Sequence, residues 1–251
     1  MLDIIMATHN HLEYTIQAIE ALKRNTMGEY RLTIIDDSTD FTPSYIWSLR
    51  DDKIRYIRPK EVIIEGNQNI NIGLKNTTSN PVVFMAQNTF VEPCWDVMSQ
   101  QIFRDNDKVA IVGAKLLYQN GLIEHAGIVA SDYGWGDIGR NEPGHRYSYN
   151  CEVPAVGFAL VFINREAFPN GMPEKLYPYG FAGPDDVDIC YSVRKRGWKV
   201  VYCGQCCAYH IANAVRNKGE DYAMKQQECC RFFLSRWGNN GTETKIEVKY
   251  G

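Results

Sequence analysis

The sequence predicts an α/β protein with a mostly parallel central sheet flanked by helices. In the first half of the 251 residues, short apolar runs alternate with stretches whose apolar positions recur at helical spacing. Such alternation is typical of βαβ units, which place parallel strands in one sheet and cover both of its faces with helices. Hydrophobic residues make up 45% of the chain, which is enough for one large core.

Each element is predicted from a local pattern. Leu12, Ile16 and Ile19 mark one face of the first helix, and Pro43 suits the first turn of the second helix. Apolar runs between turn residues predict the strands. The predicted strands are 2–7, 30–35, 54–57, 82–86, 109–113, 158–163 and 199–202, and the predicted helices are 11–26, one that opens at 42, 67–78, 93–103, 186–196 and 219–237.

Glycine and proline are dense between residues 134 and 154, which predicts a long loop. The spacing G-x-G-x-x-G occurs there at 134–139. A dinucleotide motif needs a strand, a turn and then a helix, and the sequence behind 139 cannot start a good helix. We therefore interpret the glycines as part of the loop.

Composition and charge argue against several function classes. The net charge of −3 disfavours nucleic-acid binding, which usually needs a basic patch. No apolar run is long enough to cross a membrane, and a first strand that starts at residue 2 leaves no room for a signal peptide. We therefore expect a cytoplasmic protein without a transmembrane segment, and its eight cysteines should be thiols. The spacing of Cys203, Cys206 and His210 is too incomplete for a zinc site.

Three acids stand together at the start of the helix predicted near 186. They are Asp185, Asp186 and Asp188, and His210 follows the next strand-like run. One acid would be explained as a residue that the helix dipole favours, but three exceed that need. Packed carboxylates with a histidine downstream suit a general base beside a metal or diphosphate site.

Two further polar clusters follow the first two strands. Thr8 and Asn10 come after the first strand, and Asp36 and Asp37 come at the end of the second. Ligands of open α/β sheets bind at the carboxyl ends of strands, where an Asp can accept a hydrogen bond from a ribose hydroxyl or a base N–H. The alternative is that residues 37–40 only build a turn and a helix cap.

These segments carry a resemblance. Residues 4–10, 34–40 and 71–74 look like the nucleotide-binding half of GT-A-fold, family 2 glycosyltransferases. The second half is similar to the rhamnosyltransferase-like branch, at 115–127, 156–159, 165–168 and 185–210. The matches span about residues 2 to 216 in the family's order. The resemblance implies one GT-A domain over 1–251, with a nucleotide-binding half at 1–112, an acceptor-binding half at 113–216 and a C-terminal helix and tail at 217–251.

The resemblance also implies an activity. The expected reaction is inverting transfer of a sugar from a nucleotide-sugar, a UDP- or dTDP-sugar rather than a GDP-sugar, to a hydroxyl of a glycan acceptor. Asp186 would be the general base, Asp185 stands where the family usually has Glu, and Asp188 would support the helix. The implied nucleotide-binding residues are Thr8, Asn10, Asp36, Asp37, Asn71, Gly73 and Asn88, and the implied acceptor-binding residues are Gly157 and Trp135.

The sequence departs from the family at Asn88. The family usually has an acid here that holds Mn²⁺ or Mg²⁺, and hard cations of this kind prefer carboxylates. Three options follow from this departure. A weak metal site could use Asn88 and His210, which matches the family's metal-ligand His. Transfer could instead be metal-independent, with Arg216 and Lys218 reaching the phosphates, or activity could be lost.

The sequence bears on two other functions. A non-catalytic glycan- or nucleotide-binding module is suggested by Asn88, but the intact pair Asp185–Asp186 argues against it. A nucleotidyltransferase would need a glycine-rich, basic loop after the first strand, which this sequence lacks. The oligomeric state is not predicted. The aromatic residues Tyr133, Trp135, Tyr147 and Tyr149 either stack on acceptor sugars or anchor the glycine-rich loop to the core, and the two interpretations weigh equally.

Overall fold

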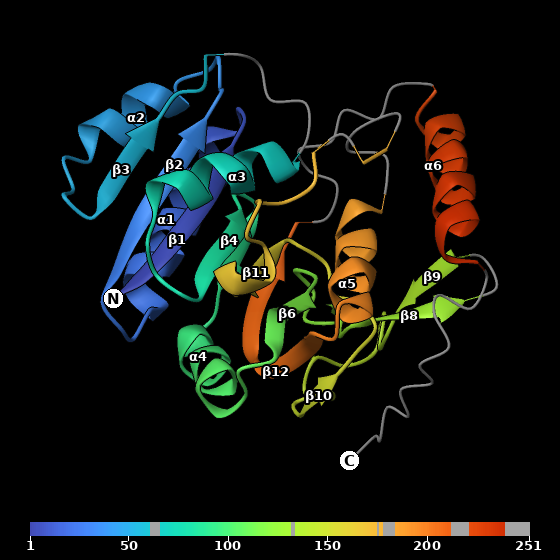
Figure 1. Ribbon diagram of the computed structural model, residues 1–251. Helices are drawn as coiled ribbons and strands as arrows, with labels where there is room; N and C mark the ends of the chain where they lie inside the picture. The colour runs from blue at the N-terminus through green and yellow to red at the C-terminus, as the bar shows by residue number, and fades with distance from the viewer. Residues whose placement is uncertain (61–65, 132–133, 175, 178–183, 212–220, 239–251) are drawn as a thin grey trace.

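A computed structural model describes residues 1–60, 66–131, 134–174, 176–177, 184–211 and 221–238 (Figure 1). Its strands are β1 (Leu2–Thr8), β2 (Tyr30–Asp36), β3 (Ile54–Ile57), β4 (Val82–Ala86), β5 (Thr89–Val91), β6 (Val109–Leu117), β7 (Ile123–His125), β8 (Ile128–Ser131), β9 (Gly134–Asp137), β10 (Asn150–Glu152), β11 (Leu160–Ile163) and β12 (Lys199–His210). Its helices are α1 (Leu12–Asn25), α2 (Thr42–Ser48), α3 (Gly66–Asn76), α4 (Trp95–Asp105), α5 (Asp185–Lys195) and α6 (Tyr222–Trp237), with a 3₁₀ turn at Arg165–Ala167. No helix among these residues is long and apolar enough to cross a membrane.

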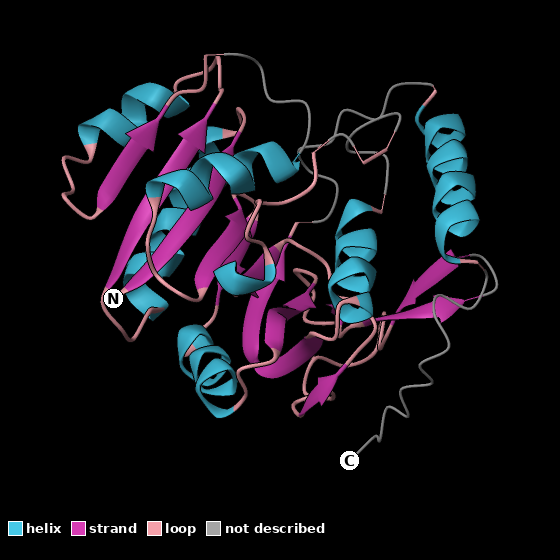
Figure 2. Ribbon diagram, viewed as in Figure 1, coloured by secondary structure: helices cyan, strands magenta, loops and turns pink. Residues whose placement is uncertain are grey.

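The central sheet is mixed but mostly parallel, as the sequence predicts. Its strand order is β10-β12-β6-β11-β4-β1-β2-β3, with β5 on β12 and β7 on β6 (Figure 2). β1 pairs in parallel with β2 and β4, and β6 pairs in parallel with β12. β11 lies antiparallel between β4 and β6, so β4 and β6 point the same way. The parallel strands from both halves of the chain therefore end at one edge of the sheet.

Helices cover both faces of the sheet. The central strand β1 shows why, because its side chains alternate between faces and are buried on both. Ile4 and Met6 belong to a core cluster that includes residues of α1, α2 and α4. Ile5 belongs to the cluster on the opposite face, which includes residues of α3, α5 and α6. Figure 1 shows α3 and α5 in front of the strands and α6 at the β9 end of the molecule. The predicted fold class is confirmed.

The long loop predicted for 134–154 is wrong in part. β9 and β10 lie within it, and β8 and β9 form a separate antiparallel pair. β10 pairs with β12 at the edge of the main sheet. Strands of three or four residues are stabilised by partners from elsewhere, so the local excess of glycine and proline hides them. β5, β7 and β8 are also absent from the prediction, because these short strands depend on partners as well. β6 and β12 run further than predicted, to Leu117 and His210.

The C-terminal helix α6 is held against α5 and β9. Phe233 is buried, with its ring 5.6 Å from that of Tyr191 in α5 and 5.4 Å from that of Trp135 in β9. Asp188, which is fully buried in α5, forms an ion pair with Arg236 of α6 at 3.3 Å. It also accepts a hydrogen bond from the Tyr177 hydroxyl at 2.9 Å. The role expected for Asp188 as a support of α5 agrees with these contacts.

Asp3, at the start of β1, ties the N-terminal strand to the segment before β4. Its buried carboxylate accepts hydrogen bonds from the backbone amides of Thr78 and Ser79, both at 2.7 Å, and from Arg31 at 3.0 Å. Burial alone would raise the pKa of this carboxyl, but the hydrogen bonds and the guanidinium outweigh burial, so its pKa lies below the ordinary value. A depressed pKa in the folded state stabilises the fold above the unfolded pKa.

We therefore expect Asp3→Asn to lower the free energy of unfolding by about 2 kcal/mol at pH 7, because charged hydrogen bonds are lost. The deficit should shrink as the pH falls below about 4, where the Asp3 carboxyl of the unfolded chain takes up a proton, and should be smallest below the depressed pKa of the folded state. Urea denaturation at several pH values measures both effects. The exposed Asp52→Asn is the control and should change little, and a deficit for Asp3→Asn that is constant with pH would contradict the charge argument.

Candidate functional site

The candidate site lies at the sheet edge where β1, β2 and β4 end. The chain leaves β1 to build β2 and β3 on one side, and it later returns to build β4 on the other side. Open α/β sheets bind ligands at the carboxyl ends of the strands where the strand order reverses, which here are β1 and β4. Both polar clusters predicted from the sequence are found at this edge.

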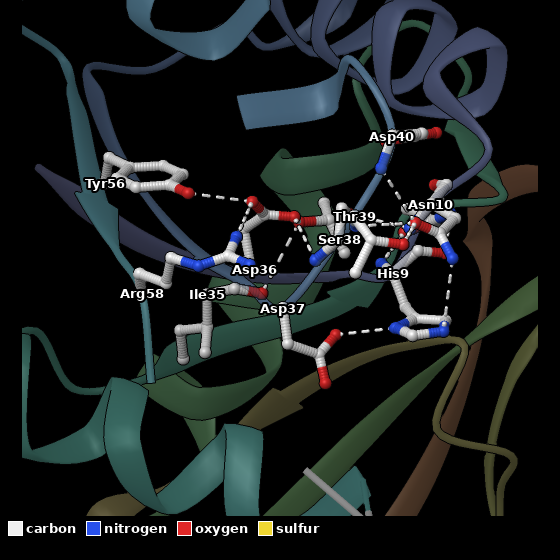
Figure 3. Close-up of polar contacts among 12 residues, drawn as sticks. His9, Asn10, Ile35, Asp36, Asp37, Ser38, Thr39, Asp40, Tyr56 and Arg58 are labelled. Carbon is white, nitrogen blue, oxygen red and sulfur yellow. Dashed lines mark hydrogen bonds and ion pairs between the residues drawn. The ribbon is translucent and has the colours of Figure 1, made fainter. Parts of the chain in front are cut away.

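The carboxylate of Asp36 forms hydrogen bonds with other residues of the protein. Its carboxylate is fully buried and accepts hydrogen bonds from the hydroxyls of Thr8 and Tyr56, both at 2.8 Å (Figure 3). The backbone amide of Ser38 donates to it at 3.1 Å, and Arg58 approaches it at 3.5 Å. Thr8 and Asp36 thus lock the ends of β1 and β2 together.

Asn10 also forms hydrogen bonds within the protein. It takes a left-handed backbone conformation, with φ of 54°, which Asn tolerates better than most residues. Its side-chain oxygen accepts from the backbone amides of Thr39 at 2.8 Å and Asp40 at 3.2 Å, as Figure 3 shows. The backbone amide of Asn10 donates to the Ser38 hydroxyl at 2.7 Å. Asn10 therefore sets the path of the loop that follows β2.

Asp37 reaches the surface. Its side chain is 15% exposed and forms an ion pair of 2.8 Å with Nδ1 of His9, whose side chain is 52% exposed (Figure 3). Of the two neighbouring aspartates, Asp37 thus lies nearer the surface while Asp36 lies inside the fold. The sequence analysis assigned no specific role to His9.

Gln87, directly after β4, was also missed. The side chain is buried, and its oxygen accepts from the backbone amide of His9 at 2.5 Å while its nitrogen donates to the carbonyl of Asn10 at 2.8 Å. Gln87 therefore connects the loop after β1 to the turn after β4. Its position directly after a buried parallel strand could have identified Gln87 as a site residue from the sequence, because ligand sites lie at the carboxyl ends of such strands.

Asn71 and Gly73, both predicted to bind the nucleotide, have packing contacts in α3. Asn71 accepts from the amide of Met172 at 2.7 Å and donates to the Glu174 carboxylate at 2.6 Å. A Cβ atom on Gly73 would lie 2.4 Å from the side chain of Ile5, so only glycine lets α3 approach β1 this closely. These contacts hold the fold together, and the nucleotide role of both residues stays a prediction.

Asn88 and His210 meet, as the resemblance implies. Asn88 lies in the turn between β4 and β5, and His210 ends β12 opposite Thr89. Nδ2 of Asn88 lies 3.3 Å from Nε2 of His210 and donates to the carbonyl of Ile211 at 2.8 Å. Nδ1 of His210 lies 2.8 Å from a carboxylate oxygen of Glu124 in β7. Glu124 is a site neighbour that sequence analysis missed.

These contacts do not fit a divalent cation. The nitrogen of Asn88, rather than its oxygen, faces His210, and an amide nitrogen is not a ligand for a hard cation. Among the residues that the structure describes, no group of three His, Cys, Asp or Glu side chains could hold a metal ion. Arg216 and Lys218, offered as a cationic replacement, lie outside the described residues.

Asp186 lies beside Gly157 and His125. It stands in the first turn of α5, where its side chain accepts from the amide of Val187 at 2.8 Å. A Cβ atom built on Gly157 would lie 3.8 Å from the Asp186 carboxylate and 4.0 Å from Nε2 of His125. Asp185, the first residue of α5, precedes it. The structure thus places the predicted base next to a predicted acceptor residue.

His125 is buried and held at both ring nitrogens. Nε2 accepts from the backbone amide of Gly157 at 3.1 Å, so the proton must be on Nδ1, which donates to Asp137 at 3.2 Å. Asp137 in turn binds Arg140 at 2.7 Å. This chain fixes the backbone of Gly157 beside Asp186, and no signal in the sequence analysis pointed to it.

The aromatic residues of the glycine-rich segment pack inward. The ring of Trp135 is half-buried and lies against Phe233, as described above. The rings of Tyr147 and Tyr149 lie 5.9 Å apart, and Tyr149 lies 6.3 Å from the ring of Tyr202 in β12. These contacts favour the anchoring interpretation for the three residues. Tyr133 lies outside the described residues.

One segment joins the two halves of the site. The carbonyl of Ala159 accepts from the backbone amide of Ala86 at 2.9 Å and from the hydroxyl of Thr89 at 3.2 Å. The segment from Gly157 to Ala159 therefore connects the neighbourhood of Asp186 to the β4–β5 turn, where Gln87 binds the backbone of His9. The partly buried carboxylate of Asp37, the imidazole of His9 and the carboxylate of Asp186 lie along one edge, where they can bind a polar ligand and accept a proton from it.

Two sequence comparisons bear on this site. The model of "Glycosyl transferase family 2" matches residues 3–152. The curated "Uncharacterized protein y4gI" of Sinorhizobium fredii is 26% identical over 94% of this chain. The alignment covers 27% of that protein, so the chain spans about a quarter of the relative's length.

Solved structures agree with the fold. GalNAc-T7 with UDP, GalNAc and Mn²⁺ has a TM-score of 0.71 at 14% identity, over 94% of this chain and 48% of that one. TarS of S. aureus, residues 1–349 with UDP-GlcNAc, has a TM-score of 0.64 at 15% identity, over 96% and 68%. The mannosyltransferase PcManGT of Pyrobaculum calidifontis, with GDP-Man and Mn²⁺, has a TM-score of 0.60 at 15% identity, over 87% and 58%.

The family model covers more than half of the chain, and the GT-A glycosyltransferase architecture extends over nearly all of it. The protein therefore belongs to glycosyl transferase family 2.

Proposed function

We propose that this protein is an inverting glycosyltransferase that moves a sugar from a nucleotide-sugar to a hydroxyl of a glycan acceptor. One observation carries the proposal. The carboxylate of Asp186 faces Gly157 at the same sheet edge where the His9–Asp37 pair reaches the surface. Membership in family 2 supports the class of reaction. Placement in the rhamnosyltransferase-like branch, and the division of the chain at 112 and 216, belong to the same proposal.

The donor is proposed to bind beside Asp37. Its carboxylate can accept a hydrogen bond from a base N–H or a ribose hydroxyl, while Thr8, Asn10 and Asp36 hold the loops that present it. The proposed donor is a UDP- or dTDP-sugar. GalNAc-T7 and TarS carry UDP and UDP-GlcNAc in their structures, which supports this choice, whereas PcManGT carries GDP-Man.

Asp186 is proposed to take the proton of the acceptor hydroxyl. As the proton moves to the carboxylate, the hydroxyl oxygen forms a bond to the anomeric carbon, and the bond from that carbon to the nucleoside diphosphate breaks on the opposite face. A single displacement of this kind inverts the configuration. The first turn of α5 holds the carboxylate in a fixed place, which favours in-line geometry.

A non-catalytic glycan- or nucleotide-binding module is the second candidate. The observation that favours it is the contact of Asn88 with His210, which replaces an acid of the family's cation site with an amide. Hydrolysis of a nucleotide-sugar separates the two candidates, because a binding module would bind the nucleotide without releasing sugar.

We expect Asp186→Asn to reduce transfer or donor hydrolysis by about 100-fold or more, since it removes the base without changing the shape of the side chain. Nucleotide affinity should stay the same, because Asp186 is proposed to contact the acceptor. Sugar release from labelled nucleotide-sugars measures the first effect and calorimetry the second. Asp107→Asn, an exposed acid outside the site, is the matched control. Full activity in Asp186→Asn would show that another group is the base.

Gly157→Ala tests the acceptor site. The added methyl group would make ordinary contacts of 3.8 and 4.0 Å, so the melting temperature should change little. The methyl group would nevertheless narrow the space beside the Asp186 carboxylate, so the KM for the acceptor should rise several-fold while donor affinity stays constant. Steady-state kinetics with varied acceptor measure this, and an unchanged acceptor KM would remove Gly157 from the proposed acceptor site.

UDP, dTDP, GDP and CDP can be compared by thermal shift. At about 100 times its Kd a nucleotide stabilises the fold by about 2.7 kcal/mol, which corresponds to a rise of roughly 5–10 °C here. UDP or dTDP should give the largest rise. Asp37→Ala should abolish the rise with little change in the unliganded melting temperature, whereas Asp36→Asn should lower that temperature itself. A rise that persists in Asp37→Ala would place the nucleotide elsewhere.

A further inference from the structure

Asn88, His210 and Glu124 form a linear chain of hydrogen bonds where family 2 enzymes are expected to hold a divalent cation. We propose that this chain has replaced the cation site, and that the protein binds its nucleotide without a divalent cation. The inference rests on the proposed function for the identity of the nucleotide, but its geometric basis is independent of it.

The orientation of the Asn88 amide follows from its partners. The carbonyl oxygen of Ile211, 2.8 Å away, can only accept a hydrogen bond, so the nitrogen of Asn88 must face it. The second N–H of the same nitrogen is then available to Nε2 of His210 at 3.3 Å. Nε2 is therefore the acceptor, and the proton of the neutral ring lies on Nδ1, which donates to Glu124 at 2.8 Å.

This arrangement uses the lone pair that a metal would need. A histidine binds a metal through an unprotonated ring nitrogen, and in His210 that nitrogen already accepts the Asn88 N–H. Turning the amide to offer its oxygen to a cation would bring two carbonyl oxygens together at Ile211. The neighbouring carboxylate, Glu124, is engaged with Nδ1 on the far side of the ring from Asn88.

The hydrogen-bonded residues Asn88, His210 and Glu124 are also held rigidly. Asn88 is buried, and the side chains of His210 and Glu124 are 16% and 13% exposed. The backbone amide of Ile211 donates to the carbonyl of Asn88 at 3.0 Å, so the turn and the end of β12 are bonded in both directions. His210 also lies in register with Thr89. A cation could not enter without breaking these contacts, so the charge of a leaving diphosphate must be offset by groups of the protein.

The test measures Mn²⁺ binding directly, by electron paramagnetic resonance of free Mn²⁺, on the whole chain. The wild type should show no saturable site up to about 1 mM Mn²⁺, a range in which carboxylate sites fill. Asn88→Asp should create one site, because it supplies a charged oxygen beside His210. The double variant Asn88→Asp with His210→Ala should lose that site again. A stoichiometric site in the wild type that Asn88→Ala abolishes would overturn the inference.

UDP affinity, measured by calorimetry in Mn²⁺ and in EDTA, supplies the second readout. Wild-type affinity should differ by less than about twofold between the two conditions, and Asn88→Asp should bind UDP at least tenfold more tightly with Mn²⁺, a gain of about 1.4 kcal/mol. UDP binding by the wild type that requires Mn²⁺ would overturn the inference and leave the proposed function standing. Absence of nucleotide binding in either condition would defeat the proposed function and the cation-free binding of a nucleotide. With the Mn²⁺ results as expected, the replacement of the cation site would still stand.

The tautomer of His210 gives a third, independent check. Long-range nitrogen–proton NMR correlations distinguish a ring protonated at Nδ1 from one protonated at Nε2. We expect the Nδ1–H form in the wild type, with assignment by the loss of the signal in His210→Ala. An Nε2–H ring would mean that Asn88 presents its oxygen to His210, which would contradict the proposed chain.

Discussion

The parallel pairing of β1 with β2 on one side and β4 on the other is the constraint on which the site depends. It brings the loops after three strands to the same edge, although 78 residues separate His9 from Gln87 along the chain. β11 extends this order into the second half, because an antiparallel strand between β4 and β6 lets β6 and β12 run in the common direction. His210, the last residue of β12, therefore lies at the same edge of the sheet as Thr8 and Asp36.

The polar residues at this edge divide into two kinds. Asp36, Asn10 and Gln87 are satisfied by hydrogen bonds within the protein, and they position the loops after β1, β2 and β4. The His9–Asp37 pair and Asp186 lie further out, towards the surface. A buried carboxylate needs such partners to stay charged, and once it has them it stiffens the loops around it. The hydrogen bonds of Asp36, Asn10 and Gln87 thus hold in place the loops that carry His9 and Asp37.

The sequence was sufficient for the parts of this arrangement that are local. The strands β1, β2 and β4, the start of α5 and the polar residues at strand ends follow from periodicity and composition. The sequence could not distinguish Asp36 from Asp37, since burial depends on which neighbour faces Tyr56, twenty positions later. Glu124 could not be recognised as a neighbour of His210 because 86 residues separate them. The short strands β5 and β7–β10 depend on partners rather than on local propensity.

The burial of Asp188 couples the helix that begins with Asp185 and Asp186 to the C-terminal part of the fold. One ion pair of 3.3 Å, to Arg236, and a hydroxyl from Tyr177 compensate this carboxylate in an interior position. A buried carboxylate that loses its cation is costly, so α5 and α6 should be displaced together rather than separately. A segment or molecule that moved α6 away from β9 would therefore also displace α5. The position of the proposed base, Asp186 in the first turn of α5, thus depends on the position of α6.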